Sequence, residues 1–503
     1  MSAVSYGDLA VYSPQQRLLL VGTLGLCLTL VGVAGIFLLG WITVVIVLAV
    51  AVSSWLIAKP RQGFYAILAA VLVVEGGSGL GFVRPLTFIY TGIDQLTGFG
   101  PPFALLDGAI ILTALGLVRQ AKKVRQALRF GEFFWPLTLL ILALLFSWAR
   151  GVNSGGDLTI GFHELRALFY VPLIYFIALN LMRDRRHLKE LAVVVVVSIL
   201  AVALGAISTH LSVVRPGTTE TLDVVFLAHE NALFAGVLVI MALASVFWGK
   251  EFKLRALFAA IGVFTLIALL VMKRRLGILA LDAGVLILGL AMIKHNWKLS
   301  VVVLPILIVI GAVYVAAYWD ATGGVGQGAR SFRTAVGEEP NTNEDRSSDD
   351  YRDLETANVE ANIHYQPFWG LGFGHEYTFV QELPDLTDFW PFQRYIPHNT
   401  VLWTWMKGGV FSFVLMLTLF GYAMIRSMRL LRRPMDPLLR AWAVTAAASV
   451  PMVFLFAWGD LGFTVVRTMM IFGLCLGLIA ALGILTERVA GPAGAPPGRA
   501  GSR

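Results

Sequence analysis

The sequence predicts an all-α integral membrane protein that crosses the bilayer many times. Its 503 residues are 57% hydrophobic and only 14% charged, and the mean hydropathy is +0.77. Soluble domains carry about 25% charged residues. About a dozen or more apolar runs are long enough to cross a hydrocarbon core of about 30 Å, which takes roughly 20 helical residues. Because open strands would leave backbone groups unpaired in lipid, we predict that these runs are helices.

The apolar runs predict about 12–14 transmembrane helices, placed near residues 18–38, 41–58, 64–80, 102–118, 133–149, 166–182, 190–208, 231–248, 256–272, 276–293, 300–318, 398–425, 440–458 and 465–485. The expected organisation is a cytoplasmic N-terminus over 1–17, eleven helices over 18–317, a large extracytoplasmic loop with short helices over 318–397, three helices over 398–485 and a disordered cytoplasmic tail over 486–503. The first run continues into the second, which favours a helical hairpin over a signal peptide. Within the large loop, we expect a flexible start and then a short helix over "LETANVEANIHY".

Basic residues predict the orientation. Lys and Arg accumulate in short cytoplasmic loops, and placing both termini in the cytoplasm puts most basic loops there: Lys59 and Arg61, 119–129, 183–189, 250–255, Lys294 and Lys298, and 426–433. The net charge of +8 therefore reflects this bias, with some attraction to anionic membrane lipid. No nucleic-acid partner is predicted.

No metal or cofactor site is predicted. The histidines show no close ligand spacing, and there is no Asp-x-Asp pair. Cys27 and Cys475 lie in separate apolar runs and are predicted to be small core residues. The segment "GLGFG" (370–374) follows no strand and is predicted to be a tight glycine turn instead of a dinucleotide loop.

One basic cluster lies where the positive-inside rule does not favour it. Lys273, Arg274 and Arg275, in "ALLVMKRRLGILAL", separate two apolar runs whose parity places the cluster outside. Cations at a membrane edge are costly and indicate a functional site. Guanidinium groups grip phosphate oxygens in bidentate fashion, which favours a diphosphate ligand. The alternative is an ordinary cytoplasmic cluster within a differently segmented region.

Further cations fall on the predicted outer side, namely Arg166, Arg215, Arg352, Arg394 and Lys407. Arg166 opens a span just after His163 and Glu164, and is either a phosphate ligand or a snorkelling interfacial anchor. Glu230 either pairs with His229 or an arginine, or caps the next helix. Together these cations favour a polyanion at the outer leaflet.

The stretch "YIPHNTVLWTWMKGG" (395–409) places His398 at the start of a predicted helix. Pro397 suits the first helical position, and the positive end of the helix dipole disfavours an imidazolium. A general base must be neutral, so we predict that role for His398, against an interfacial or capping role. Gly408 and Gly409 would lie about 15 Å below it and allow close approach of a lipid or helix. Lys407 either binds phosphate or snorkels.

These residues resemble the O-antigen ligase/polymerase superfamily of bacterial membrane glycosyltransferases. "YQPFWGLGFG" (365–374) is similar to its Pro-x-x-Gly-x-Gly-x-Gly segment, through Gly370, Gly372 and Gly374. "PHNTVLWTWMKGGVFS" is similar to its His-Asn-x9-Gly pattern, through His398, Asn399 and Gly409. "KRRLGILAL" resembles its Ser-Arg-Gly segment, with Arg275 at the arginine and Arg274 replacing the serine, and Arg352 matches a further basic position.

The resemblance implies a GT-C-like fold in the bacterial inner membrane, with an extracytoplasmic active site and no cofactor. The implied donor is a glycan on undecaprenyl diphosphate, and the acceptor is a glycan or glycolipid. His398 would act on the acceptor hydroxyl, Asn399 would position it, and Arg275, with Arg166 or Arg352, would hold the diphosphate. Arg274, Lys273 and Lys407 are further predicted substrate ligands.

Three alternatives remain open from the sequence. Transfer onto a lipopolysaccharide core would make the protein a ligase, and transfer onto a repeat unit would make it a polymerase; the replaced serine and Ser412 depart from the ligase pattern. A flippase of lipid-linked glycans would be expected to show two related halves, and none is evident. A scaffold role would leave Lys273, Arg274 and Arg275 unexplained.

Overall fold

The computed structural model describes residues 23, 41–74, 89–92, 102–213, 228–295, 297–322, 326–388 and 390–490. Within these ranges the protein is an all-α integral membrane protein, as predicted, and its only β pairing is an isolated bridge between Gly92 and Ala104. The helices are α2 (Trp41–Ala58), α3 (Pro60–Val73), α5 (Leu105–Lys123), α6 (Phe134–Asn153), α7 (Leu158–Leu181), α8 (Arg185–Val213), α9 (Glu230–Trp248), α10 (Phe252–Val271), α11 (Arg275–His295), α12 (Trp297–Ala317), α13 (Gln327–Ala335), α14 (Asn343–Tyr365), α15 (Thr400–Leu431), α16 (Pro437–Gly459) and α17 (Val466–Ala490).

Ten of the described helices are long and apolar enough to cross a membrane, or up to eleven if one bent pair forms a single span. That pair is α2 and α3, which meet at 118° and so are not the two separate spans predicted at 41–58 and 64–80. Pro60 begins α3, and the residue before a proline is restricted to non-helical backbone, which explains the bend. The span predicted over 102–118 is helical as α5 but is not among the apolar candidates. The expected span over 18–38 lies outside the described residues, except for Thr23.

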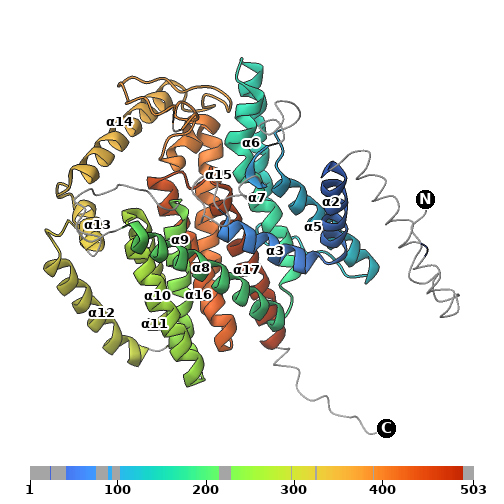
Figure 1. Ribbon diagram of the computed structural model, residues 1–503, viewed down its shortest axis with the longest axis vertical. Coiled ribbons are helices and arrows are strands. Elements are labelled where there is room, and N and C mark those ends of the chain that lie inside the picture. Colours follow the sequence, from blue (N-terminus) through green and yellow to red (C-terminus); the bar gives the residue numbers. More distant parts are fainter. Residues whose placement is uncertain are drawn as a thin grey trace, which may run out of the picture.

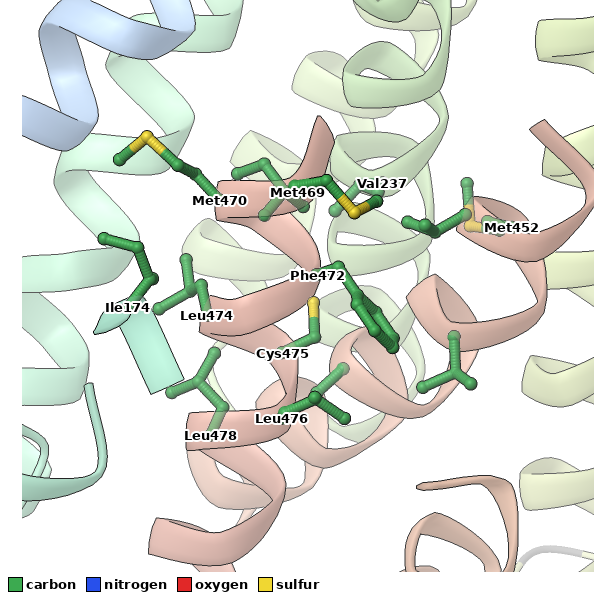
Figure 2. Packing of buried hydrophobic residues seen from close by; sticks show 14 of the residues in the cluster. Ile174, Val237, Met452, Met469, Met470, Phe472, Leu474, Cys475, Leu476 and Leu478 are labelled. Carbon is green, nitrogen blue, oxygen red and sulfur yellow. The ribbon is translucent and has the colours of Figure 1, made fainter. Parts of the chain in front are cut away.

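The helices α7, α9, α16 and α17 form the buried centre of the bundle (Figure 1). Side chains of α17 pack against those of its neighbours, with Phe472, Leu476 and Cys475 inside the cluster (Figure 2). Gly473 and Gly477, four residues apart, face α7 so closely that an added Cβ at Gly473 would lie 2.7 Å from the Val171 carbonyl. Small residues at this spacing let two membrane helices approach closely. In contrast, α12 is almost entirely exposed and lies away from the centre in Figure 1.

The polar region between α12 and α15 folds as two helices, α13 and α14, and α14 lies across one end of the bundle (Figure 1). The expected flexible start of this region is wrong for residues from 343 onwards, because α14 begins at Asn343, well before "LETANVEANIHY". Thr342 caps α14 by accepting a hydrogen bond from the Asp345 N–H at 3.1 Å. A threonine hydroxyl at this position satisfies one of the free donors at a helix start. Thr342 is a typical helix-capping residue, but the acidic and polar composition of the residues after it favours the prediction of a flexible loop over that of a helix.

Candidate active site

The helix α15 begins later than the sequence analysis predicted. Asn399 is its N-cap, with the side chain accepting from the Leu402 N–H at 3.0 Å, and the first helical residue is Thr400. His398 therefore precedes the cap and does not lie in the first turn behind Pro397. Asparagine is among the strongest N-cap residues because its short side chain reaches the free N–H groups. Asn399 thus has an observed structural role, and its predicted substrate contact stays a prediction.

Gly409 breaks α15 into two parts. Its φ is 72° and its ψ is 177°, a backbone conformation open to glycine, so the uninterrupted helix predicted over 398–425 is wrong. The segment 367–374 closes the break: the N–H groups of Leu371 and Gly372 donate to the carbonyls of Met406 (2.7 Å) and Lys407 (3.0 Å). The carbonyl groups left free by the break are therefore satisfied. The predicted close approach at this glycine is made by the protein's own glycine-rich turn.

The glycine-rich turn is itself held by a buried ion pair. Lys407 is fully buried, and its ammonium lies 2.9 Å from a carboxylate oxygen of Glu164 on α7 and donates to the His375 carbonyl. The other oxygen of Glu164 accepts from the Gly374 N–H at 2.6 Å. Buried charges are paired in proteins, so in this geometry Lys407 joins α15 to α7 and to the glycine-rich turn. This observation favours neither phosphate binding nor snorkelling, the two predicted roles of Lys407.

His398 forms a pair with a buried carboxylate on α14. Glu355 is 1% exposed, accepts the His398 backbone N–H at 2.7 Å and lies 3.1 Å from its Nδ1. A carboxylate only accepts hydrogen bonds, so Nδ1 carries the proton and Nε2 has a free lone pair. No described residue forms a hydrogen bond with Nε2, and the His398 side chain is 18% exposed. The imidazole is therefore fixed on one edge and open on the other, as a general base requires.

Two aromatic rings flank the imidazole of His398. Tyr351 and Trp390 meet it edge-on, with ring centroids at 5.7 Å and 5.1 Å. The amide of Gln393 donates to the Tyr351 hydroxyl at 3.1 Å and links α14 to the loop before α15. Burial and the nearby Glu355 raise the pKa of Tyr351 to about 12, so its phenol stays neutral at physiological pH. These contacts limit rotation of the imidazole and exclude water from its sides.

Arg275 lies near His398 because both residues contact α14. Its guanidinium binds Asp349 through two nitrogens, at 2.6 Å and 2.9 Å, and Asp345 at 3.2 Å. The contact positions Asp349 and Glu355 are about 9 Å apart along the helix axis at 1.5 Å per residue. The structure thus brings these two predicted residues to one end of the bundle, with Arg275 already paired to carboxylates.

Arg352 lies between those two contact positions on α14, three residues from each. It makes no hydrogen bond or ion pair with any described residue and is partly exposed. Against the opposing effect of burial, Arg352 helps to lower the pKa of Asp460, which follows α16, although His229 beside that carboxylate has the larger effect. Arg352 is therefore a predicted phosphate ligand whose guanidinium donors are not used by the described residues, one helical turn before Glu355, the partner of His398.

The other predicted ligands have different surroundings. Arg166 is buried and pairs with Asp107 at 3.1 Å and with the Tyr90 carbonyl at 2.9 Å, which joins α7 to α5. Lys273 is exposed in the turn between α10 and α11, with φ 50°, and the neighbouring Arg274 is partly buried. The structure does not bring Arg166 to His398, because its guanidinium is used in packing.

Sequence reasoning assigned no site role to four polar residues of this end of the bundle, Glu355, Asp460, His229 and Arg467, and named His229 only as a possible partner of Glu230. Arg467 is buried, pairs with Glu230 at 2.8 Å, and donates to the Val71 and Leu72 carbonyls that end α3. Each of the four is a lone polar residue at the edge of an apolar run or in an acidic helix. An intramembrane cation needs a carboxylate partner, so the sequence predicts that Arg467 pairs with an acidic residue, but not which one. Within the described ranges, no group of three His, Cys, Asp or Glu side chains is placed to hold a metal ion.

The family comparison covers most of these residues. Residues 260–417 match the family model described as O-antigen ligase, a range that includes Arg275, Arg352, the glycine-rich turn and His398. This match supports the resemblance of that segment to the O-antigen ligase/polymerase superfamily. The match supports a ligase- or polymerase-type membrane function in polysaccharide biosynthesis. A search of curated proteins finds no match to the sequence.

Proposed function

We propose that this protein transfers a glycan from an undecaprenyl-diphosphate carrier to an acceptor hydroxyl at the extracytoplasmic face of a bacterial inner membrane. The observation that carries the proposal is the Glu355–His398 pair, in which Nε2 makes no hydrogen bond with a described residue, together with the partly exposed Arg352 one helical turn before Glu355 on α14. A base for a hydroxyl and a cation for a phosphate are the two groups that this reaction needs side by side.

His398 acts on the acceptor. Its Nε2 takes the proton of the acceptor hydroxyl while that oxygen bonds to the anomeric carbon of the donor. The bond from the anomeric carbon to the diphosphate oxygen breaks, and its electron pair leaves with the lipid diphosphate. The proton on Nδ1 stays with the imidazole, because Glu355 holds it and stabilises the imidazolium that forms.

Arginines act on the leaving group. Arg352 has five N–H donors in a planar fork, which matches phosphate oxygens, and none of them is used by a described residue. Arg275 holds α14 over the bundle through its pairs with two carboxylates, and so positions Arg352 on that helix. Fixed cations stabilise developing negative charge without reorganisation, so in this proposal they serve in place of a divalent metal.

The acceptor decides between two activities of the same site. A sugar of a lipid A core as acceptor makes the protein an O-antigen ligase, which we favour because of the matched family model. A second lipid-linked repeat unit as acceptor makes it a polymerase, which is the alternative.

The proposal is tested with the purified full chain, a lipid-diphosphate-linked glycan and each acceptor in separate reactions. We expect release of lipid diphosphate with one acceptor, and its loss in His398→Ala and Arg352→Ala. The matched control is His364→Ala, since His364 is an exposed α14 histidine that contacts only its own helix at the Glu360 carbonyl. Equal rates in all variants would refute the site, and release with neither acceptor would refute the reaction.

A further inference from the structure

A second imidazole–carboxylate pair lies at the end of the bundle that carries His398, and the proposed reaction leaves it without a role. His229 directly precedes α9, and its Nδ1 contacts a carboxylate oxygen of Asp460, the residue that ends α16. The Asp460 side chain is 5% exposed, whereas that of His229 is 37% exposed. The imidazole is therefore held on its buried edge and open on its other edge.

Hydrogen bonds tie this pair to the start of α15. The Thr400 hydroxyl donates to the main-chain oxygens of Ala457 (2.9 Å) and Asp460 (3.1 Å), and it accepts from the Phe463 N–H at 3.1 Å. Thr400 is two residues beyond His398. The two imidazoles thus belong to one hydrogen-bonded unit made of the ends of α9, α15 and α16.

Asp460 lies among positive groups. Burial alone would raise the pKa of Asp460, but His229 beside it, with smaller effects of Arg352 and His398, holds that pKa below its ordinary value. The remaining oxygen of Asp460 accepts the Leu461 N–H at 2.8 Å. The buried carboxylate of Asp460 is therefore a shared electrostatic partner of His229, Arg352 and His398.

The second ring nitrogen of His229, Nε2, has no hydrogen-bond partner among the described residues. A carboxylate only accepts, so Nδ1 donates to Asp460, and Nε2 forms no hydrogen bond or ion pair with the residues that the structure describes. The adjacent carboxylate, Glu230, does not compete for it because Glu230 pairs with Arg467 at 2.8 Å. When Nε2 also carries a proton, it presents an N–H donor and a positive charge close to Asp460, the carboxylate on which Arg352 also acts.

We propose that His229 is a donor-binding residue that grips the diphosphate together with Arg352, with its Nε2–H donating to a phosphate oxygen and Asp460 fixing the ring. This inference rests on the proposed function for the identity of the ligand. It concerns only diphosphate binding, so it is testable without any glycan transfer.

The test measures calorimetric binding of farnesyl diphosphate to the purified full chain in detergent. His229→Asn keeps an amide nitrogen near the position of Nδ1, and so retains a donor to Asp460, but it removes the outward nitrogen. Losing one charge-assisted hydrogen bond raises the dissociation constant about tenfold or more. His229→Gln retains an outward amide donor, and we expect a smaller loss of about threefold. His364→Asn is the matched control, with unchanged binding expected. Thermal unfolding shows that each variant is folded.

Two further ligands identify what His229 contacts. If His229→Asn weakens the binding of inorganic diphosphate as much as that of farnesyl diphosphate, the head group alone is recognised. If His229→Asn weakens only the binding of farnesyl diphosphate, the lipid positions the head group. Both results support the proposal. Equal loss of farnesol binding would overturn it, because farnesol has no phosphate. Wild-type binding in His229→Asn, or no binding of farnesyl diphosphate to the wild type, would also overturn it. Absence of glycan transfer with His229-dependent diphosphate binding would refute the proposed function and leave this inference standing.

Discussion

Replacing Glu355 by glutamine tests how the protein prepares its base. The carboxylate receives the His398 backbone N–H at 2.7 Å and lies 3.1 Å from Nδ1, so it holds the proton on Nδ1. In Glu355→Gln, the amide oxygen still accepts the backbone N–H, but the NH2 group then faces Nδ1 and donates to it. The imidazole changes to the tautomer with its proton on Nε2, and Nε2 is no longer an acceptor.

The expected loss follows from the contribution of a positioned base. General base catalysis contributes about 10²–10⁴-fold, so kcat in Glu355→Gln should fall by about that factor. The Kd of the lipid diphosphate should stay within about twofold, because phosphate binding does not use this tautomer. Exchanging a charge-assisted hydrogen bond for a neutral one costs about 1 kcal/mol of stability, so the variant should remain folded.

The assay compares kcat for release of lipid diphosphate, per folded protein, in wild type and variant. Glu360→Gln is the matched control, since Glu360 is an exposed glutamate on the same helix. A kcat of Glu355→Gln close to that of wild type would refute the reasoning, because it would show that Glu355 does not set the state of the His398 imidazole.

Three further predictions concern the framework around the site, and thermal unfolding in detergent measures each. Gly409→Ala should lose about 1–3 kcal/mol from its positive φ, whereas Gly421→Ala, a helical glycine of α15 with open space around it, should be neutral or stabilising. Lys407→Met should lose about 3–5 kcal/mol by leaving the Glu164 carboxylate buried alone, and adding Glu164→Gln should restore part of it; equal loss in both would contradict the pairing. The pKa of Asp460 is lowered, so the stability advantage of wild type over Asp460→Asn should be complete above about pH 4 and shrink as the pH falls further. An advantage that disappears already between pH 7 and pH 5 would contradict that sign.

The helices were largely predictable because hydrophobic length is a strong signal in a membrane protein. The predicted runs at 256–272 and 276–293 correspond to α10 and α11, with Arg275 at the start of α11. The break at Gly409 was not predictable from hydropathy, since the apolar pattern continues through it. What decides the break is a turn more than thirty residues earlier, which supplies hydrogen bonds to the free carbonyls.

The charged groups of the candidate site were noticeable in the sequence as individual residues, but their pairing was not predictable. His398, Arg275 and Arg352 carry a local signal, because each is a polar residue at the edge of an apolar or extracytoplasmic segment. Their partners come from other elements, and the sequence does not record which carboxylate lies opposite which cation. For this reason Lys407 was interpreted as a substrate ligand, although it binds Glu164 on a distant helix.

The central claim is that this chain forms a glycosidic bond at the expense of a lipid diphosphate. The most direct measurement uses the reconstituted wild-type protein and counts, in the same sample, the lipid diphosphate released and the glycan joined to the acceptor. We predict equal amounts of both products. Glycan that crosses the vesicle membrane while still attached to its diphosphate, with no acceptor modified, would contradict the claim and indicate a flippase.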